Sequence, residues 1–544
     1  MSREKLFAIL AYFSLICATV SMIGIPENAR ADTWHGGHIT GTEEWKPGDN
    51  DHIVKEHVYV DMGAILKIYV GSVVKFDDDM GLFVDGKLII ISGYLNYTQV
   101  LFTSSNGKPS EGIWYGIQFN MSSTSDSFLA NSTIEYATYG VRFAHTNTSA
   151  RILRDVTITN STYGIQADTS YIKFVGGEVR DCEYGVNSSW TATEAPQGYV
   201  DIVEGAFTNI SQVGILLHAD VVAQSVRAAN IENNTISGNG YGVHLWNASA
   251  QIYNNNISSN IRGIRGFGSA AWILSNEMYS NILNGIYFSK GIWASANSVE
   301  IEGNLLVNSP LGITVFDSHG NISGNNVSYS NAWGIATANT TGLIENNTLY
   351  ANGWYNGNWA NCINCSGLLV QTPTPNPYDL MVMNNTVVNN SRGVILNGYV
   401  FLGNNSIQEN YYGIISGYYG SGKAILDNNT ISWNSHTGVR LFRTYDFTIA
   451  IYNQIENNTI YGAYFDNGAN GTLNMNNIAN NTKTQDSYGV YNADNSVKIG
   501  AKHNWWGDPT GPQHGDNPFG NGDPAWGEMD FDPWESLPIG GAGP

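Results

Sequence analysis

Charged residues and long apolar runs are both scarce in this sequence. Only 13% of its 544 residues are charged, and no long amphipathic helical stretch is evident, so the composition does not favour a helical fold. Beyond residues 6–25 no apolar span is long enough to cross a membrane, and we expect no transmembrane anchor. Basic residues are fewer than acidic ones, 25 against 46. This balance argues against nucleic acid or an anionic membrane as a partner.

The segment 1–31 has the features of a secretory signal peptide. Arg3 and Lys5 precede the apolar run, and Ala29-Arg30-Ala31 has the small-x-small form that signal peptidase accepts. We therefore expect a secreted, extracellular protein, either in solution or associated with a cell surface. Without residues 1–31 the chain has 22 basic and 44 acidic residues, so its formal net charge is about −22.

A short repeat runs through the sequence at intervals of roughly 18 to 30 residues. Each copy has Asn, any residue, an aliphatic residue, a short polar turn, and then Gly followed by another aliphatic residue. A leucine-rich-repeat frame is absent, and single aliphatic residues alternate with polar ones. The repeat therefore predicts short strands stacked in a parallel β-helix. The clearest copies begin at Asn234, Asn255, Asn325, Asn405, Asn429 and Asn476.

The repeat also predicts how the corners of each coil are made. The Asn would lie at a turn, where it tolerates unusual backbone angles and where its amide can bond to the Asn of the next coil. The Gly would give the next corner a backbone shape that a Cβ would obstruct. We expect the β-helix to span residues 63–504. An N-terminal cap at 32–62 and a C-terminal capping segment at 505–544 would cover its ends, because an open end exposes pairing edges.

Both ends of this span resemble a known family. Residues 63–76, 84–89, 100–104 and 112–117 are similar to the first coils of secreted right-handed parallel β-helix proteins of the pectin-lyase-like superfamily, particularly the NosD-like and archaeal surface proteins. Residues 504–512 and 530–534 are similar to their closing segment. The resemblance implies an all-β, single-stranded right-handed parallel β-helix, a solenoid with capping segments at both ends. It leaves activity open, because this fold carries lyases, hydrolases, epimerases, adhesins and scaffolds.

Strand alternation predicts which side chains share the outer face of the coils. If the aliphatic residue after each Gly points inward, the residue after it and the one two positions further point outward. Lyases of this fold use that face, so the resemblance implies a His or Arg base, an Arg that neutralises a uronate, and an Asp acting as acid or as ligand for Ca²⁺. A solvated face that merely collects charged residues is the alternative. The candidate catalytic residues are Arg142, Asp168, His218, Asp220, His244 and Arg265.

Two insertions interrupt the repeat, near residues 190–200 and 350–380. Loops on a solenoid carry binding function more often than the coils do. Exposed Trp and Tyr rings offer flat apolar faces on which sugar rings can stack. A loop folded onto the rod to cover apolar side chains is the alternative. The candidate carbohydrate-binding residues are Trp190, Trp354, Tyr355 and Trp359.

Cys362 and Cys365 lie in the second insertion with C-x-x-C spacing. Such a pair can be a redox pair, half of a zinc site or a loop disulfide, and an oxidising exterior favours the disulfide. N-x-[ST] sequons are dense, although a repeat of Asn, Asn and Ser or Thr creates them by accident. They predict glycosylation where the host has the machinery. The candidate sites are Asn96, Asn131, Asn147, Asn209, Asn247, Asn321, Asn339 and Asn470.

Two classes of function remain compatible with these features. The first is a secreted or cell-surface rod that binds a polysaccharide, a surface glycan or other cell-surface proteins. The second is a polysaccharide lyase or glycoside hydrolase that acts on the outer face of coils 142–265. We favour the first, because the catalytic motifs of β-helix enzymes are missing whereas polar turns and aromatic loops are abundant. A NosD-like role in copper delivery is less favoured, because no Met-rich or His-rich tract is present.

Overall fold

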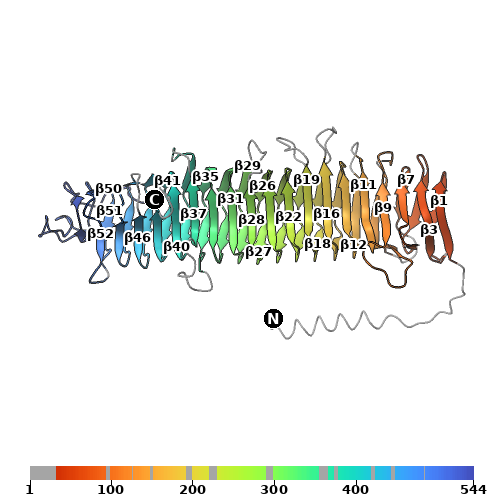
Figure 1. Cartoon of the computed structure of the whole chain (residues 1–544), viewed down its shortest axis with the longest axis horizontal. Coiled ribbons are helices and arrows are strands. Elements are labelled where there is room, and N and C mark those ends of the chain that lie inside the picture. Colours follow the sequence, from red (N-terminus) through yellow and green to blue (C-terminus); the bar gives the residue numbers. More distant parts are fainter. Residues whose placement is uncertain are drawn as a thin grey trace, which may run out of the picture.

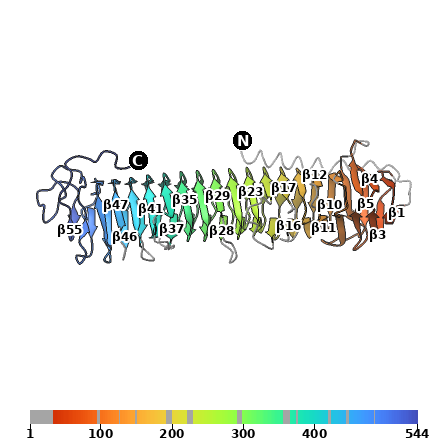
Figure 2. The ribbon, with the colours of Figure 1, turned by 90° about the horizontal axis from the view of Figure 1, so that it is seen from above.

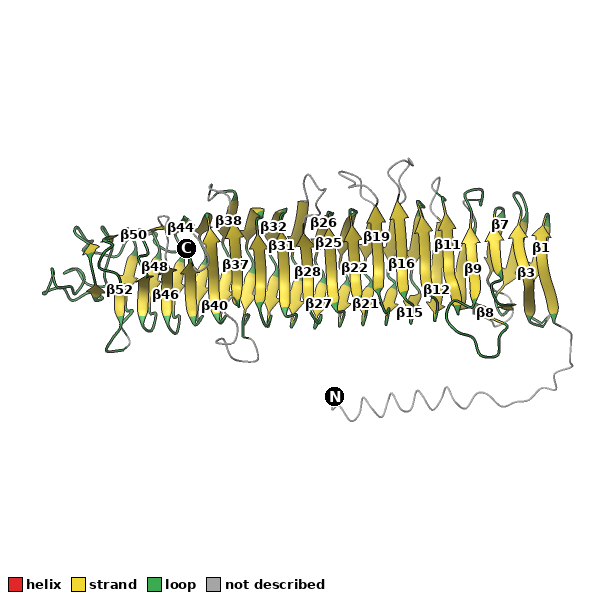
Figure 3. Cartoon of the chain, viewed as in Figure 1, coloured by secondary structure: helices red, strands yellow, loops and turns green. Residues whose placement is uncertain are grey.

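The protein is an elongated rod of stacked β-strands (Figure 1). In the described part of the chain the secondary structure consists of strands and no helix (Figure 3). The strands pair in parallel and wind as a right-handed β-helix, which confirms the fold expected from the sequence. The computed structural model describes residues 32–48, 50–93, 98–124, 126–146, 151–190, 199–219, 229–289, 298–354, 365–372, 376, 378–417, 423–442, 448–482 and 484–544.

Each coil contributes one strand to each of three sheets, which we call A, B and C. In a typical coil β22 (Tyr241–Trp246) lies in sheet A, β23 (Ser249–Tyr253) in sheet B and β24 (Asn256–Ser258) in sheet C. The next coil begins with β25 (Arg262–Phe267), which pairs with β22. Equivalent residues of successive coils are therefore stacked about 4.8 Å apart along the rod.

The remaining strands follow the same order. Sheet A also contains β6 (Gly81–Val84), β9 (Trp114–Phe119), β11 (Ala137–Ala144), β13 (Tyr163–Asp168), β16 (Tyr184–Trp190), β19 (Val213–Ala219), β28 (Asn284–Ser289), β31 (Leu311–Phe316), β34 (Trp333–Ala338), β37 (Ser366–Thr372), β40 (Arg392–Gly398), β43 (Tyr412–Ser416), β46 (Thr437–Phe442), β49 (Tyr461–Asp466), β52 (Tyr488–Asn492) and β54 (Ala525–Trp526).

Sheet B also contains β2 (Thr42–Trp45), β4 (Ile65–Tyr69), β7 (Lys87–Ile91), β14 (Ile172–Val175), β17 (Val200–Val203), β20 (Ala229–Glu232), β26 (Ala270–Leu274), β29 (Ser298–Glu302), β32 (His319–Ser323), β35 (Thr341–Glu345), β38 (Leu380–Met383), β41 (Val400–Gly403), β44 (Ala424–Asp427), β47 (Thr448–Ile451), β50 (Gly471–Asn474), β53 (Ile499–Gly500) and β55 (Met529–Asp530).

Sheet C also contains β5 (Val73–Phe76), β8 (Val100–Ser104), β15 (Glu178–Arg180), β18 (Ala206–Thr208), β21 (Thr235–Ser237), β27 (Glu277–Tyr279), β30 (Leu305–Val307), β33 (Asn326–Ser328), β36 (Thr348–Tyr350), β39 (Thr386–Val388), β42 (Ser406–Gln408), β45 (Thr430–Ser432), β48 (Gln454–Glu456) and β51 (Asn477–Ala479). Four long strands bend from one sheet into the next: β1 (Thr33–Ile39), β3 (His52–Val60), β10 (Phe128–Glu135) and β12 (Arg151–Thr159).

An asparagine ladder holds the corner between sheets B and C, as the repeat predicts. The Asn234 side-chain amide donates to the Asn255 Oδ1 atom at 2.9 Å, and Asn255 donates to Asn276 at 2.9 Å. The unusual backbone angle belongs to the residue before the ladder Asn, since Asn233 has a φ of 55° and Asn254 of 56°. The ladder comprises Asn234, Asn255, Asn276, Asn304, Asn325, Asn347, Asn385, Asn405, Asn429, Asn453, Asn476 and Asn504.

A second ladder, which the sequence did not reveal, holds the corner between sheets C and A. It is interrupted at Ser309 and Ser330, which take the place of Asn in two coils and are likewise buried. Its other members are Asn239, Asn260, Asn281, Asn352, Asn390, Asn410, Asn434, Asn458 and Asn481.

The repeat Gly follows this second ladder and lies against the next coil. A Cβ on Gly334 would come within 2.7 Å of the Gly367 carbonyl oxygen and 2.9 Å of the Asn352 Nδ2 atom. No left-handed φ is found at Gly334, so the repeat selects glycine for close packing and not for backbone shape. The aliphatic residue after it is fully buried, as at Val243, Ile264 and Ile335.

The two ends of the rod are built differently. The expected N-terminal cap at 32–62 begins instead as the first coil of the solenoid, because β1 pairs with β3 and β2 pairs with β4 in parallel. At the other end, residues 505–544 pack Trp506 and Phe531 into the core. The final residues then run back along the rod (Figure 2), where the Gly543 amide donates to the Tyr452 carbonyl oxygen at 2.9 Å. Across the described residues no helix has the length and apolar character needed to span a membrane.

Candidate functional site

The predicted outer column of sheet A is present in the structure with the expected register. Strand pairing stacks Arg142 on Gln166, His244 on Leu216, and Arg265 on His244. The second column, two residues further along each strand, stacks Asp168 on Ala144 and His218 on Ser189. Asp220 lies outside the described residues.

The candidate catalytic residues fall into two separate groups along this face. Arg142 and His244 are four coils apart, because strand pairing runs from 142 through 166, 187 and 216 to 244. At about 4.8 Å per coil, this separates them by roughly 19 Å. A single sugar residue therefore cannot contact both Arg142 and His244, whereas Asp168 and His218 are only two coils apart. Arg142 and Asp168 form one group, and His218, His244 and Arg265 form the other.

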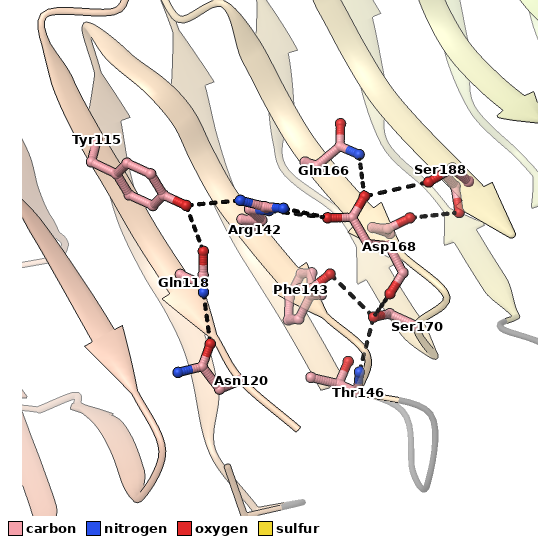
Figure 4. A network of polar contacts seen from close by, with 12 residues as sticks. Tyr115, Gln118, Asn120, Arg142, Phe143, Thr146, Gln166, Asp168, Ser170 and Ser188 are labelled. Atoms are coloured by element: carbon pink, nitrogen blue, oxygen red, sulfur yellow. Dashed lines mark hydrogen bonds and ion pairs between the residues drawn. The ribbon is translucent and has the colours of Figure 1, made fainter. Parts of the chain in front are cut away.

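Arg142 and Asp168 are joined in a polar network (Figure 4). The Arg142 Nη2 atom lies 2.9 Å from the Asp168 Oδ2 atom, and Nε also donates to this oxygen at 3.0 Å. A third donor bond runs from Nη1 to the Tyr115 hydroxyl oxygen at 2.8 Å, and that hydroxyl donates to Gln118 at 2.6 Å. The other Asp168 oxygen accepts from Gln166 at 2.6 Å. Both members of the pair therefore use much of their hydrogen-bonding capacity within the protein.

The same pairing recurs far along the rod. Arg440 donates from Nη2 to the Asp466 Oδ2 atom at 2.9 Å, again from one sheet A strand to the next. In both pairs the Asp lies 26 residues after the Arg, and the guanidinium lies over a tyrosine ring, Tyr139 or Tyr412. A motif that occurs twice at distant coils favours a structural role for the Arg142–Asp168 pair, namely the neutralisation of charges on the outer face.

The second group is surrounded by aromatic rings and by a further arginine. Strands β19, β22 and β25 place seven side chains on neighbouring coils of sheet A. We call this surface the central strip: His218, Tyr241, His244, Trp246, Arg262, Arg265 and Phe267.

His244 is the most enclosed member of the central strip. Its ring stacks on Tyr241 with centroids 5.0 Å apart, and its Nε2 atom is buried without a hydrogen-bond partner among the described residues. Burial, together with the positive charges of Arg265 and Arg262, lowers the pKa of His244 to about 4. The imidazole is therefore neutral at neutral pH. Because its Nε2 atom is covered, that atom cannot reach a polymer on the surface.

Trp246 forms the exposed aromatic part of the central strip. Its side chain is 40% exposed, and its ring centroid lies 4.9 Å from that of Phe267 in the next coil. The ring also makes edge contacts with His218 at 6.2 Å and with His244 at 6.1 Å. Strand alternation already places Trp246 and Phe267 outward. The two aromatic residues at these positions could therefore have predicted an aromatic surface from the sequence.

Tyr241 and Arg262 are the members that sequence reasoning missed. Each lies directly before the repeat Gly of its coil, and the two are stacked as partners between β22 and β25. Strand alternation counted from the residue after the Gly predicts only the two columns that follow it, so this third column, before the Gly, lies outside that prediction. Both Arg262 and Arg265 donate to the Tyr241 hydroxyl oxygen, at 2.8 Å and 3.0 Å.

Of the predicted carbohydrate-binding residues of the insertions, the structure describes Trp190 and Trp354. Trp190 is only 5% exposed and belongs to the hydrophobic core, because strand alternation after the outward Ser189 turns it inward. Its ring therefore cannot serve as a sugar platform, which corrects the expectation. Trp354 is half-buried and donates from its ring nitrogen to the Asn389 carbonyl oxygen at 2.7 Å. Tyr355 and Trp359 lie outside the described residues.

The cysteines and the other predicted sites are resolved in part. Cys365 is disulfide-bonded and fully buried, whereas Cys182 is a free, buried thiol. Cys362, the expected partner, lies outside the described residues, as do the sequons Asn96 and Asn147.

In the described segments no three His, Cys, Asp or Glu side chains gather as a metal site. The other predicted glycosylation residues are all at least partly exposed: Asn131, Asn209, Asn247, Asn321, Asn339 and Asn470.

Comparison with known proteins identifies similarity in fold. A family model described as a right handed beta helix region matches residues 195–349, 241–414 and 378–505. No curated protein sequence matches the chain.

Solved structures are similar at low identity. A mutant of the periplasmic alginate epimerase AlgG has 10% identity and a TM-score of 0.23, over 89% of this chain and 78% of the other. The Agl-KA catalytic domain has 11% identity and a TM-score of 0.20, over 86% and 62%. The A-module of the mannuronan C-5 epimerase AlgE6 from Azotobacter vinelandii has 11% identity and a TM-score of 0.18, over 90% and 91%.

Proposed function

The chain belongs to the right-handed β-helix family, and from this premise we propose that it is a secreted, rigid rod that binds carbohydrate through the central strip of sheet A. The proposal rests on one observation above all, the exposed ring of Trp246 beside Phe267 on a face of hydrogen-bonding side chains. Sugar rings present an apolar C–H face and polar hydroxyl groups. A flat aromatic ring surrounded by donors matches both.

The rest of the fold supports binding by a preformed surface. The rings and guanidinium groups of the central strip project from three consecutive strands that are paired in register. The two asparagine ladders fix the corners of these coils through buried hydrogen bonds. Because the strands are held in place before any ligand arrives, binding would cost little conformational entropy.

The central strip also bears on the enzymatic alternative, a lyase or hydrolase. Of the six candidate catalytic residues, Arg142 and Asp168 are engaged with each other, and the Nε2 atom of His244 is covered. Only His218 and Arg265 remain as described, partly exposed candidates for proton transfer. Among the described candidates, an enzyme built on this strip would therefore use these two side chains.

The test is retention of the protein on immobilised polysaccharides, together with release of reducing-end or unsaturated products. We expect retention without products. Trp246→Ala should weaken binding about tenfold, because it removes the stacking surface. The matched control is Trp433→Ala, since Trp433 is 54% exposed and lies outside sheet A, directly after β45. Equal binding by both variants would refute the proposed site. Product release that His218→Ala abolishes would establish the enzymatic alternative.

A further inference from the structure

Arg262 and Arg265 lie close together, and no carboxylate among the described residues pairs with either of them. Neither takes part in an ion pair with a described residue, although acidic residues outnumber basic ones in this chain by 46 to 25. Two other sheet A arginines are neutralised by carboxylates, Arg142 by Asp168 and Arg440 by Asp466. Two adjacent guanidinium groups that lack an anion, in a protein rich in anions, mark a place where an external anion would be favoured.

Tyr241 links the two arginines. Its hydroxyl oxygen accepts one hydrogen bond from the Arg262 Nη1 atom at 2.8 Å and one from the Arg265 Nη1 atom at 3.0 Å. A hydroxyl has two acceptor positions and one donor hydrogen. Both acceptor positions are used, so the hydrogen of Tyr241 is left to donate, and none of the described residues accepts it.

The tyrosine ring also positions the cations. The guanidinium carbons of Arg262 and Arg265 lie 5.3 Å and 5.5 Å from its centroid, and His244 stacks on the same ring. Because the imidazole of His244 has a pKa lowered by burial, it adds no positive charge at neutral pH. The charge of the cluster therefore comes from the two arginines.

We propose that Arg262, Tyr241 and Arg265 form a receptor for an oxyanion carried by the carbohydrate ligand, either a carboxylate or a sulfate ester. All the free hydrogen-bonding groups of this triad are donors, and guanidinium groups bind planar or tetrahedral oxyanions through several parallel hydrogen bonds. The triad adjoins Trp246 and Phe267 in the same two coils. His244 lies between Tyr241 and Trp246, so a polymer that runs along these strands with one sugar on the aromatic rings would place the acidic group of a neighbouring sugar on the arginines. This inference rests on the proposed function, because the anion is taken to be part of the carbohydrate that binds to the central strip.

The experiment compares binding of the full-length mature protein to a polyuronate, a sulfated polysaccharide and a neutral glucan by calorimetry. We expect binding of at least one anionic polymer, weakened by added salt because the contact is partly exposed. Arg262→Gln and Arg265→Gln should each weaken that binding about tenfold. Tyr241→Phe keeps the ring and removes the hydroxyl, and it should weaken binding as well. The matched control is Arg154→Gln, because Arg154 is exposed on β12 and has no carboxylate partner among the described residues.

The outcomes separate this inference from the proposed function. Anion binding that is lost in the arginine variants but not in Arg154→Gln supports the triad, and the polymer that binds identifies carboxylate or sulfate as the anion. Unchanged binding of the anionic polymers in both arginine variants would overturn the triad, as would the absence of any anionic binding. In either case, neutral glucan binding that depends on Trp246 would leave the carbohydrate-binding function standing.

Discussion

Asp523 ends the second asparagine ladder by taking the position that asparagine holds in earlier coils. Its Oδ2 atom accepts from the Asn481 main-chain amide at 2.9 Å and from the Asn481 side-chain amide at 3.0 Å. The carboxyl group is 7% exposed, and burial raises its pKa to about 6 despite these two donors. The C-terminal segment is therefore attached to the last coils through an acid whose ionised form is unfavourable in the folded protein.

Replacing this acid with an amide should change how stability depends on pH. The folded-state pKa lies above the unfolded value of 3.8, so the contribution of Asp523 is largest below pH 4 and is lost as the pH rises through 6. We expect Asp523→Asn to be more stable than the natural protein at pH 8 by up to about 3 kcal/mol, since one pKa unit corresponds to about 1.4 kcal/mol. Calorimetric Tm values at pH 4 and pH 8 give the comparison. A variant that is equally destabilised at both values would contradict this account.

Neighbouring asparagines in the repeat should differ sharply in their effect on stability. Asn325 is buried in the first ladder, where it donates to Asn347 at 3.0 Å and accepts from Asn304 at 2.9 Å, whereas Asn326 is exposed. Asn325→Ala would leave buried donors without acceptors and should cost about 3 kcal/mol. Asn326→Ala should change stability by less than about 0.5 kcal/mol. Chemical denaturation of the two variants tests the difference, and equal losses would argue against the ladder as a main source of stability.

Acid should open the first coil before the rest of the rod. His35 contacts His52 through ring nitrogens 2.9 Å apart, and its ring lies tilted against that of Trp45 with centroids 4.3 Å apart. Burial and the neighbouring His52 lower the pKa of His35 to about 4. Because the unfolded value of 6.5 is higher, the stability of this coil falls as the pH drops from 6.5 towards 4.

Hydrogen exchange can follow this opening. After correction for intrinsic rates, protection of residues 33–45 should fall about tenfold or more between pH 7 and pH 4, while that of β22 and β23 changes less. His35→Phe keeps a ring against Trp45 and should remove most of the acid effect. Substitution of the exposed His38 serves as the control. Uniform loss of protection along the rod would show that His35 does not set the acid response.

Peptide mapping of the non-reduced protein should find Cys365 linked to Cys362 and Cys182 unmodified. Cys365 is disulfide-bonded, and Cys182 is a buried free thiol whose pKa burial raises to about 12. A thiol that stays protonated and covered reacts slowly with alkylating reagents, so Cys182 should be labelled only after unfolding. Any linkage between Cys365 and Cys182 would contradict both the prediction and the structure.

The fold and the register of sheet A followed from the sequence, because the repeat Gly anchors each coil and strand alternation has a period of two. This is why His244 and Arg265 were placed correctly on adjacent coils. Side-chain contacts between coils could not be predicted in the same way. The contact between Arg142 and Asp168 runs diagonally between strands and spans 26 residues, so no local pattern contains it.

Other differences between the sequence predictions and the structure also have local causes. The second ladder was missed because its positions accept Ser as well as Asn, as at Ser309, and lie among many other asparagines in the turns. Trp190 was assigned to an insertion, although alternation from Ser189 already turns it towards the core. The sequence predicts a cap at residues 32–62, whereas these residues begin a coil whose inward side chains include His35 and Trp45 in place of aliphatic ones.

Several neighbouring coils have the same length in both ladders, and this bears on how such a protein can change in length. Asn234, Asn255 and Asn276 follow one another at intervals of 21 residues, and so do Asn239, Asn260 and Asn281 in the other ladder. Removing or duplicating one such unit would leave every remaining asparagine opposite a partner. Each event would shift the ends of the molecule by about 4.8 Å and leave the cross-section unaltered. The length of the rod can thus change in steps of one coil, independently of what any one coil binds.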